Sequence, residues 1–157
     1  VCVGMALASK MNGQKCRIYT VMGDGELAEG SVWEGAMAAS HYKLDNLCAV
    51  VDRNRLQISG NTEDVMAHDD LHERFRAFNW HVIDVEDGND IGQLKAAFEE
   101  ARETKGKPSV LIANTIKGKG SSVMENKAGW HHKVPSEEEL AQIRKDLKER
   151  KEALSVE

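Results

Sequence analysis

Residues 16–26 read CRIYTVMGDGE, and this stretch starts the pattern that determines the fold. Its first seven residues are largely apolar or β-branched and are bounded by polar residues and glycine, which predicts a strand over 16–22. Gly-Asp-Gly at 23–25 predicts a turn. Apolar residues then recur at helical spacing over 26–42, with carboxylates in the first turn, where they suit the helix dipole. The nearly continuous apolar run at 47–51 predicts a second strand, covered on both faces.

The same alternation continues along the rest of the chain. We expect further helices at 1–11, 68–79, 91–104 and 136–154, further strands at 80–85 and 108–113, and irregular segments at 52–67 and 114–135. This rhythm predicts an α/β fold, a three-layer, doubly wound parallel sheet with helices on both faces.

The chain is interpreted as a single domain over 1–157. Its last element, the helix within 136–157, begins with a capping box formed by Ser136 and Glu139. The chain opens at Val1, inside an apolar helical pattern and without a cap residue. We therefore expect it to be a fragment of a longer polypeptide.

Composition limits the classes of partner. The 157 residues carry a net charge of −5 and no lysine- or arginine-rich run, which argues against nucleic acid or a membrane as the main partner. No apolar stretch is long enough to span a bilayer. The three cysteines are scattered and sit in apolar contexts without metal-ligand spacing, so we expect buried, reduced thiols in a cytoplasmic protein.

The irregular segments at 23–25, 52–67 and 114–135 all follow predicted strands. In a parallel sheet the carboxyl ends of the strands lie at one edge, where ligands bind, so we expect these three segments to meet there.

Three oxygen donors are expected at that edge. Asp24 offers a carboxylate, Asn54, thirty residues later, offers an amide oxygen, and Leu56 offers a backbone carbonyl. Oxygen ligands with a single formal charge suit a hard cation such as Mg²⁺ that brings phosphate oxygens with it. Gly25 precedes a helix, where free N–H groups favour a phosphate. The alternative is that Gly-Asp-Gly is only a tight turn.

Several basic and histidine residues are further candidates. His131 lies in a glycine- and lysine-rich loop at the expected ligand edge, which favours a functional role. Lys117 and Lys119 are either phosphate contacts or solvated loop charges. His68 and His72 are spaced i, i+4, but no third ligand accompanies them, so we expect a surface helix face.

Longer strings carry a family resemblance. They are GDGELAEGSVWE at 23–34, HYKLDNL at 41–47, DRNRLQISG at 52–60, KGKG at 117–120 and WHHKVP at 130–135. Together they resemble the N-terminal, diphosphate-binding half of transketolases, most closely the split type encoded as two subunits. The Gly-Asp-Gly to Asn spacing resembles the thiamin diphosphate fingerprint. The resemblance runs from residue 1 to about residue 140 and implies a thiamin diphosphate-binding fold.

The resemblance implies a cofactor and a set of site residues. The cofactor is thiamin diphosphate with Mg²⁺, for which Ca²⁺ or Mn²⁺ could substitute. The implied metal ligands are Asp24, Asn54 and the Leu56 carbonyl. The implied cofactor contacts are Asp24, Gly25, Glu26, Asn54, Leu56, Ile58, Lys117 and His131.

His131 and Glu29 are the implied catalytic residues. His131 matches a histidine near the diphosphate and the sugar substrate, although the neighbouring His132 leaves open which of the two points inward. Glu29 matches a glutamate at the subunit interface, and Glu34 is a further candidate there.

The implied activity is transfer of a two-carbon ketol unit from a ketose phosphate to an aldose phosphate, as in the pentose phosphate pathway. It requires a pyrimidine-binding domain in the C-terminal transketolase half, and a second copy in a dimer or heterotetramer. We expect the 157 residues alone to be catalytically silent.

Three other interpretations remain open. The chain could belong to another thiamin enzyme, such as a deoxyxylulose-phosphate synthase or a 2-oxoacid dehydrogenase E1 component. The Asp52-Arg53-Asn54 closure, in place of two adjacent asparagines, argues against these. The others are a non-catalytic dimerisation module and a general Mg²⁺/nucleotide-diphosphate binder without a P-loop.

Overall fold

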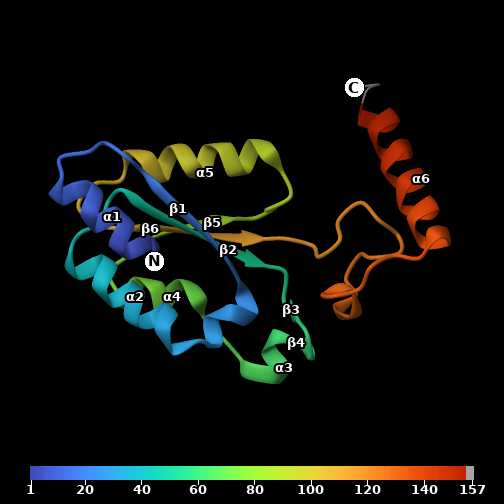
Figure 1. Cartoon of the computed structure of the whole chain (residues 1–157), viewed down its shortest axis with the longest axis horizontal. Helices are drawn as coiled ribbons and strands as arrows, with labels where there is room; N and C mark the ends of the chain where they lie inside the picture. Colours follow the sequence, from blue (N-terminus) through green and yellow to red (C-terminus); the bar gives the residue numbers. More distant parts are fainter. Residues whose placement is uncertain (155–157) are drawn as a thin grey trace.

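A parallel sheet forms the centre of the structure, a computed structural model that describes residues 1–154 (Figure 1). The strand order is β1 (Ile18–Gly23), β2 (Leu47–Arg53), β6 (Ser109–Asn114) and β5 (His81–Val85), and all pairs are parallel. β2 and β6 occupy the middle and are buried along almost their whole length. This position explains their continuous apolar sequences.

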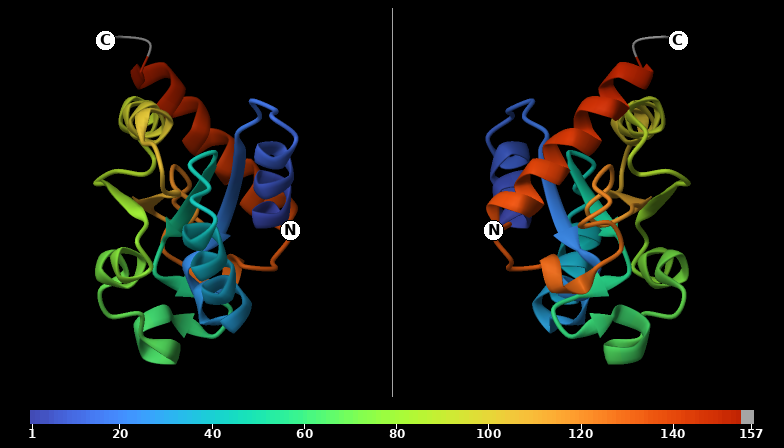
Figure 2. Two further views of the ribbon diagram at one scale, coloured as in Figure 1. Left: turned by 90° about the vertical axis from the view of Figure 1, so that its left-hand side faces the viewer. Right: turned by 90° about the vertical axis from the view of Figure 1, so that its right-hand side faces the viewer.

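Helices cover both faces of the sheet. α1 (Cys2–Met11), α2 (Gly30–His41) and α4 (Leu71–Ala77) pack on one face, and α5 (Ile91–Glu103) packs on the other (Figures 1 and 2). Each face has its own apolar cluster. The predicted three-layer, doubly wound α/β arrangement is confirmed.

The direction of the crossovers explains which helix lies on which face. From β1 through α2 to β2, and from β2 through α4 to β5, the chain moves across the sheet in one direction. From β5 through α5 to β6 it moves back by one strand. Because such crossovers are right-handed, the reversal puts α5 on the opposite face.

The predicted helix over 26–42 is two elements. η1 (Asp24–Ala28) is a single 3₁₀ segment, and α2 starts only at Gly30, after an extended Glu29 (φ −74°, ψ 123°). The Glu26 carboxylate accepts a hydrogen bond from the Gly23 N–H (3.3 Å), and the Trp33 indole N–H donates to the Leu27 carbonyl (2.8 Å). These contacts stabilise η1 as a separate turn, and the extended Glu29 separates it from α2.

The segment predicted as a loop at 52–67 contains regular structure. β2 continues to Arg53, β3 (Leu56–Gln57) and β4 (Gly60–Asn61) form a short antiparallel hairpin, and α3 (Thr62–Met66) follows. The Asn61 side chain caps α3 by accepting the Glu63 N–H (2.8 Å). The prediction of a loop without regular structure at 52–67 was therefore wrong. The strands were missed because two residues are too few to show a periodic pattern in the sequence.

The prediction of a surface helix face for His68 and His72 was wrong for His68. α4 begins at Leu71, capped by Asp70, whose carboxylate accepts the Glu73 N–H (3.0 Å). His68 precedes the helix and is 1% exposed. His72 is half-buried and contacts the Asp84 carboxylate (2.9 Å).

The cysteines also differ from their prediction. Cys48 is buried, Cys2 is half-buried and Cys16 is exposed, and all three are free thiols. Burial raises the pKa of the Cys48 thiol to about 11. The expectation of buried thiols therefore holds fully only for Cys48.

The last part of the chain lies beyond the carboxyl ends of the strands (Figure 1). An irregular segment with a short 3₁₀ turn, η2 (Ala128–Trp130), leads to α6 (Glu137–Leu154). Ser136 and Glu139 form the predicted capping box, and residues 155–157 of the predicted segment lie outside the described residues. Within residues 1–154, no helix has the length and apolarity needed to cross a membrane.

Candidate active site at the carboxyl edge of the sheet

A polar pocket of about 560 Å³ lies where β1 and β2 end. The turn after β1, the hairpin after β2 and the segment after β6 all contribute to it, as the sheet topology predicts. It is lined by Gly23, Asp24, Gly25, Glu26, Asp52, Asn54, Leu56, Gln57, Ile58, Ser59, Lys117 and His131. All eight cofactor contacts implied by the family resemblance are among them, whereas Lys119, the other lysine suggested as a phosphate contact, is not.

Asp24 is the buried carboxylate of this pocket, with 1% of the residue exposed. Its Oδ2 accepts hydrogen bonds from the Arg53 guanidinium (3.0 Å) and from the Arg55 backbone N–H (2.6 Å). Its Oδ1 accepts from the Gly25 N–H (2.9 Å). A buried charge needs such partners, and they fix the carboxylate in one orientation.

Asn54 and Leu56 supply the other two oxygens. The Asn54 Oδ1 accepts the Leu56 N–H (3.0 Å), which folds the chain back over the end of β2. An amide oxygen has a second lone pair, and the Leu56 carbonyl is a further acceptor. A carboxylate, an amide oxygen and a carbonyl form an all-oxygen donor set that fits a hard divalent cation, with phosphate or water oxygens completing the coordination.

Gly25 is required by a close approach. A Cβ at this position would lie 2.8 Å from Oε1 and 2.9 Å from Cβ of Gln57. The turn after β1 and the hairpin therefore touch at this point and form one wall of the pocket.

Asp52, Gln57 and Ser59 line the pocket but were not predicted as site residues from the sequence. Asp52 accepts a hydrogen bond from the Thr115 hydroxyl, which joins the ends of β2 and β6. Its place one residue before the end of a strand, next to the candidate ligands, was a usable signal. Gln57 and Ser59 were missed because they belong to the hairpin that the sequence did not predict.

Lys117 and His131 close the pocket from the segment that follows β6. His131 is exposed, and its pKa is lowered, first by slight desolvation and then by the electrostatic effect of His132 and Lys117. The two histidine rings meet edge to face with centroids 4.5 Å apart. Of the two, only His131 lines the pocket, so the structure places His131 rather than His132 at the site.

Glu29 lies outside the pocket. It is the exposed N-cap of α2, and Glu34 is exposed on the same helix. The structure therefore separates these glutamates from the residues that converge around Asp24.

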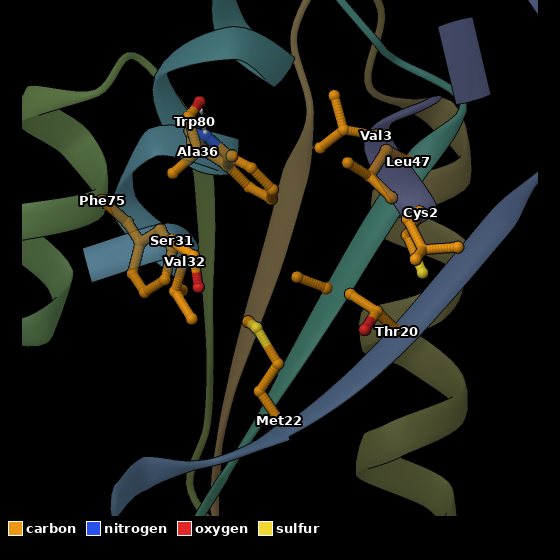
Figure 3. Close-up of a pocket in the computed structure, with 13 residues that line it drawn as sticks. Cys2, Val3, Thr20, Met22, Ser31, Val32, Ala36, Leu47, Phe75 and Trp80 are labelled. Carbon is orange, nitrogen blue, oxygen red and sulfur yellow. Dashed lines mark hydrogen bonds between the residues drawn. The ribbon is translucent and has the colours of Figure 1, made fainter. Parts of the chain in front are cut away.

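A second pocket, of about 280 Å³, lies between the sheet and the helices α1 and α2 (Figure 3). Its labelled side chains, among them Met22, Val32, Phe75 and Trp80, surround an apolar space, and the Trp80 indole N–H donates to the Ala36 carbonyl (2.9 Å). None of the described residues that line it has a carboxylate, amide or basic side chain. The described lining of this pocket therefore contains none of the oxygen donors and basic groups that line the polar pocket.

A parallel α/β sheet with oxygen donors and a lysine at its carboxyl edge has the arrangement of a ligand-binding α/β domain. The family described as transketolase, thiamine diphosphate binding domain, matches residues 5–156. The chain belongs to this family.

Similar sequences support this family assignment. An apulose-4-phosphate transketolase subunit of Phocaeicola vulgatus is 46% identical over 155 residues, which cover 99% of this chain and 55% of the relative. The 6-deoxy-6-sulfo-D-fructose transketolase subunit SqwG of a Clostridium species is 44% identical over 136 residues, which cover 87% of this chain and 49% of the relative. The chain thus spans about half the length of these relatives.

Solved structures show the same fold. The transketolase of Pichia stipitis in complex with sedoheptulose 7-phosphate superposes with a TM-score of 0.87 at 29% identity, over 93% of this chain and 23% of that one. The transketolase of Campylobacter jejuni gives 0.88 at 28% identity, over 94% and 24%.

Proposed function

We propose that the polar pocket binds the diphosphate of thiamin diphosphate through a bridging Mg²⁺, held by Asp24, Asn54 and the Leu56 carbonyl. The observation that carries this proposal is the convergence of these three oxygen donors with Lys117 and His131 in one pocket of a domain from this family. Ca²⁺ and Mn²⁺ accept the same kind of donor and are proposed as substitutes.

The remaining lining residues have separate proposed roles. Lys117 supplies positive charge to the diphosphate, and Gly25 lets the backbone approach it. Glu26 holds the turn through the Gly23 N–H (3.3 Å), and Ile58, which is 64% exposed, offers apolar surface to the cofactor. In this division Lys117 contributes the charge, and the other three shape the wall.

The proposed reaction is transfer of a two-carbon ketol unit between sugar phosphates. Bound thiamin diphosphate supplies the carbon chemistry, and the protein supplies binding and orientation. His131, whose pKa is lowered by its surroundings, is proposed to hold a hydrogen bond to the substrate as a neutral imidazole. Glu29, exposed at the start of α2, is proposed to act at an interface with a second copy rather than in this pocket.

A partner is part of the proposal. Two relatives carry names that mark them as one subunit of an apulose-4-phosphate transketolase. We propose that a C-terminal half with a pyrimidine-binding domain completes the site, in a cytoplasmic dimer or heterotetramer that acts on sugar phosphates, as in the pentose phosphate pathway.

Titration calorimetry tests the binding step. Thiamin diphosphate is titrated into the chain combined with a pyrimidine-binding half, with Mg²⁺ and then with EDTA. The expected result is binding that requires the metal. Absence of binding under both conditions would favour a non-catalytic dimerisation module.

An activity assay tests the reaction. The complete complex is given xylulose 5-phosphate with ribose 5-phosphate, and in parallel apulose 4-phosphate, because two relatives at 46% and 45% identity are named for it. Ketol transfer is expected from the complex and not from the chain alone. Decarboxylation of a 2-oxoacid in place of ketol transfer would point to another thiamin enzyme.

A further inference from the structure

Arg53 connects three elements beneath the polar pocket without lining it. Its side chain leaves β2 next to Asn54 and is 10% exposed. One guanidinium nitrogen, Nη1, donates to the Asp24 Oδ2 (3.0 Å) and to the Thr62 hydroxyl (2.9 Å), and Nη2 donates to the Glu63 carboxylate. A single buried side chain thus joins β2, η1 and α3.

We propose that Arg53 is a positioning residue that presents Asp24 to the divalent cation, an inference that rests on the proposed function of the pocket. Arg53 and the Arg55 N–H occupy the Asp24 Oδ2. Among the described residues, Oδ1 has only the Gly25 N–H as partner, and it is the oxygen left for a cation. Groups that orient a metal ligand in this way commonly affect metal affinity by about 10- to 100-fold.

The same guanidinium also holds the hairpin that carries Leu56. The β3–β4 hairpin begins after Arg53 and ends before Thr62. The Arg53 guanidinium donates a hydrogen bond to the Thr62 hydroxyl. The Arg55 carbonyl accepts the Thr62 N–H (3.0 Å), which closes the same loop. Arg53 therefore contacts one proposed ligand, Asp24, directly and holds the return end of the hairpin that carries another, Leu56.

Glu63 balances the charge of Arg53. The hydrogen bond from Arg53 is the main cause of a lowered pKa of the Glu63 carboxyl. With Glu63 ionised, part of the positive charge of Arg53 is compensated, so Asp24 remains available to a cation. The guanidinium reaches these three acceptors from two nitrogens in one plane, a spacing that the single nitrogen of a lysine ammonium group does not reproduce.

The test is Mn²⁺ binding measured by electron paramagnetic resonance in the presence of thiamin diphosphate, in the chain combined with the pyrimidine-binding half. Arg53→Lys is compared with Arg76→Lys, a matched control on α4. The Arg76 guanidinium pairs with Glu73 on the surface, and Arg76 does not line the polar pocket. Arg53→Lys is expected to weaken Mn²⁺ binding by about 10- to 100-fold and to change the spectrum of bound Mn²⁺, with Arg76→Lys within about twofold of wild type.

Circular dichroism and urea midpoints separate positioning from folding. Wild-type affinity in folded Arg53→Lys would overturn the inference, and so would a loss that matches only the unfolded fraction. If wild type itself binds no Mn²⁺, the proposed function of the pocket fails and this inference fails with it. If wild type binds Mn²⁺ and folded Arg53→Lys binds it equally well, only this inference fails, and the proposed function of the pocket stands.

A second pair of variants serves if Arg53→Lys does not fold. Glu63→Gln keeps an acceptor for Arg53 but removes the balancing charge, and Asp64→Asn makes the same charge change on the exposed part of the same helix. Glu63→Gln is expected to weaken Mn²⁺ binding by about threefold and Asp64→Asn to leave it unchanged. Equal effects of the two variants would overturn the role of the Arg53–Glu63 pair.

Discussion

The apolar pocket and the polar pocket differ in the residues that line them. The apolar pocket lies against one face of the sheet, under α1 and α2, and is lined by core side chains such as Leu47 and Trp80. The polar pocket lies at the carboxyl edge and is lined by charged and amide side chains from three connections. Side chains on the strand faces form the core, and the connections after the strands bring the candidate site residues together.

The change between the two regions occurs within β1. Thr20 and Met22 line the apolar pocket, and Gly23 and Asp24, the next residues along the chain, line the polar one. Because the two regions share a strand but none of their described lining residues, substitutions in the apolar pocket should leave cation binding by the folded fraction largely intact. The following variants test that separation.

The largest effect is expected from Phe75→Ala in the apolar pocket. Phe75 is 1% exposed and packs against Trp33 and Trp80, with ring centroids at 5.2 and 5.6 Å. The loss of this side chain should lower the free energy of unfolding by about 3–5 kcal/mol, measured by urea denaturation. Mn²⁺ affinity of the folded fraction should not change. A tenfold loss of that affinity would show that the two regions are coupled.

Asp24→Asn should reduce binding even in the folded fraction. It should also destabilise the fold, because it leaves the buried Arg53 guanidinium without its charged partner. It keeps the size of the side chain but removes the charged ligand, so cation-dependent binding of thiamin diphosphate should fall by about 100-fold in calorimetry. Asp64→Asn, on the exposed face of α3, is the matched control and should bind normally. Normal binding by Asp24→Asn would remove Asp24 from the proposed site.

Gly25→Ala should act through the contact between the turn and the hairpin. The new Cβ would meet Gln57 at 2.8–2.9 Å, an overlap expected to destabilise the fold by about 1–3 kcal/mol and to weaken cofactor binding. Gly23→Ala is the matched control, since no described residue lies within 4 Å of a Cβ there. Thermal unfolding of both variants would contradict this account if Gly23→Ala were the less stable one.

The smallest effect is expected at Lys117. Lys117→Gln removes one positive charge from the polar pocket and should weaken thiamin diphosphate binding by about fivefold, an effect that diminishes in high salt. Lys119 does not line the pocket and pairs with Glu125 (3.7 Å), so Lys119→Gln should bind as wild type. Calorimetry at two salt concentrations distinguishes the two lysines, and equal losses would argue for a general charge effect.

Sequence patterns were sufficient for the layers of the fold and for the edge of the sheet at which the candidate residues meet. The apolar runs in β2 and β6 predicted buried strands, and parallel topology alone brought Asp24, Asn54 and Lys117 to one edge. The order of the strands in the sheet was not predictable, because an apolar strand sequence does not indicate which other strand will pair with it. The β3–β4 hairpin was missed because its strands have two residues each.

Sequence patterns did not predict contacts between side chains that are distant in the sequence. Arg53 reaches Asp24 from 29 positions away, and no periodicity indicates which buried charge will meet which. His68 is a second case. Its spacing from His72 suggested a helix surface, whereas Asp70 caps the helix two residues later and leaves His68 buried, with its Nε2 lacking a hydrogen-bond partner within residues 1–154.

The most direct test of the central claim is the location of Mn²⁺ by anomalous scattering from crystals grown with Mn²⁺ and thiamin diphosphate. The proposed site predicts one peak about 2.0–2.2 Å from the Asp24 carboxylate, the Asn54 amide oxygen and the Leu56 carbonyl. A peak only at the acidic residues Asp69 and Asp70, with none at Asp24, would contradict it.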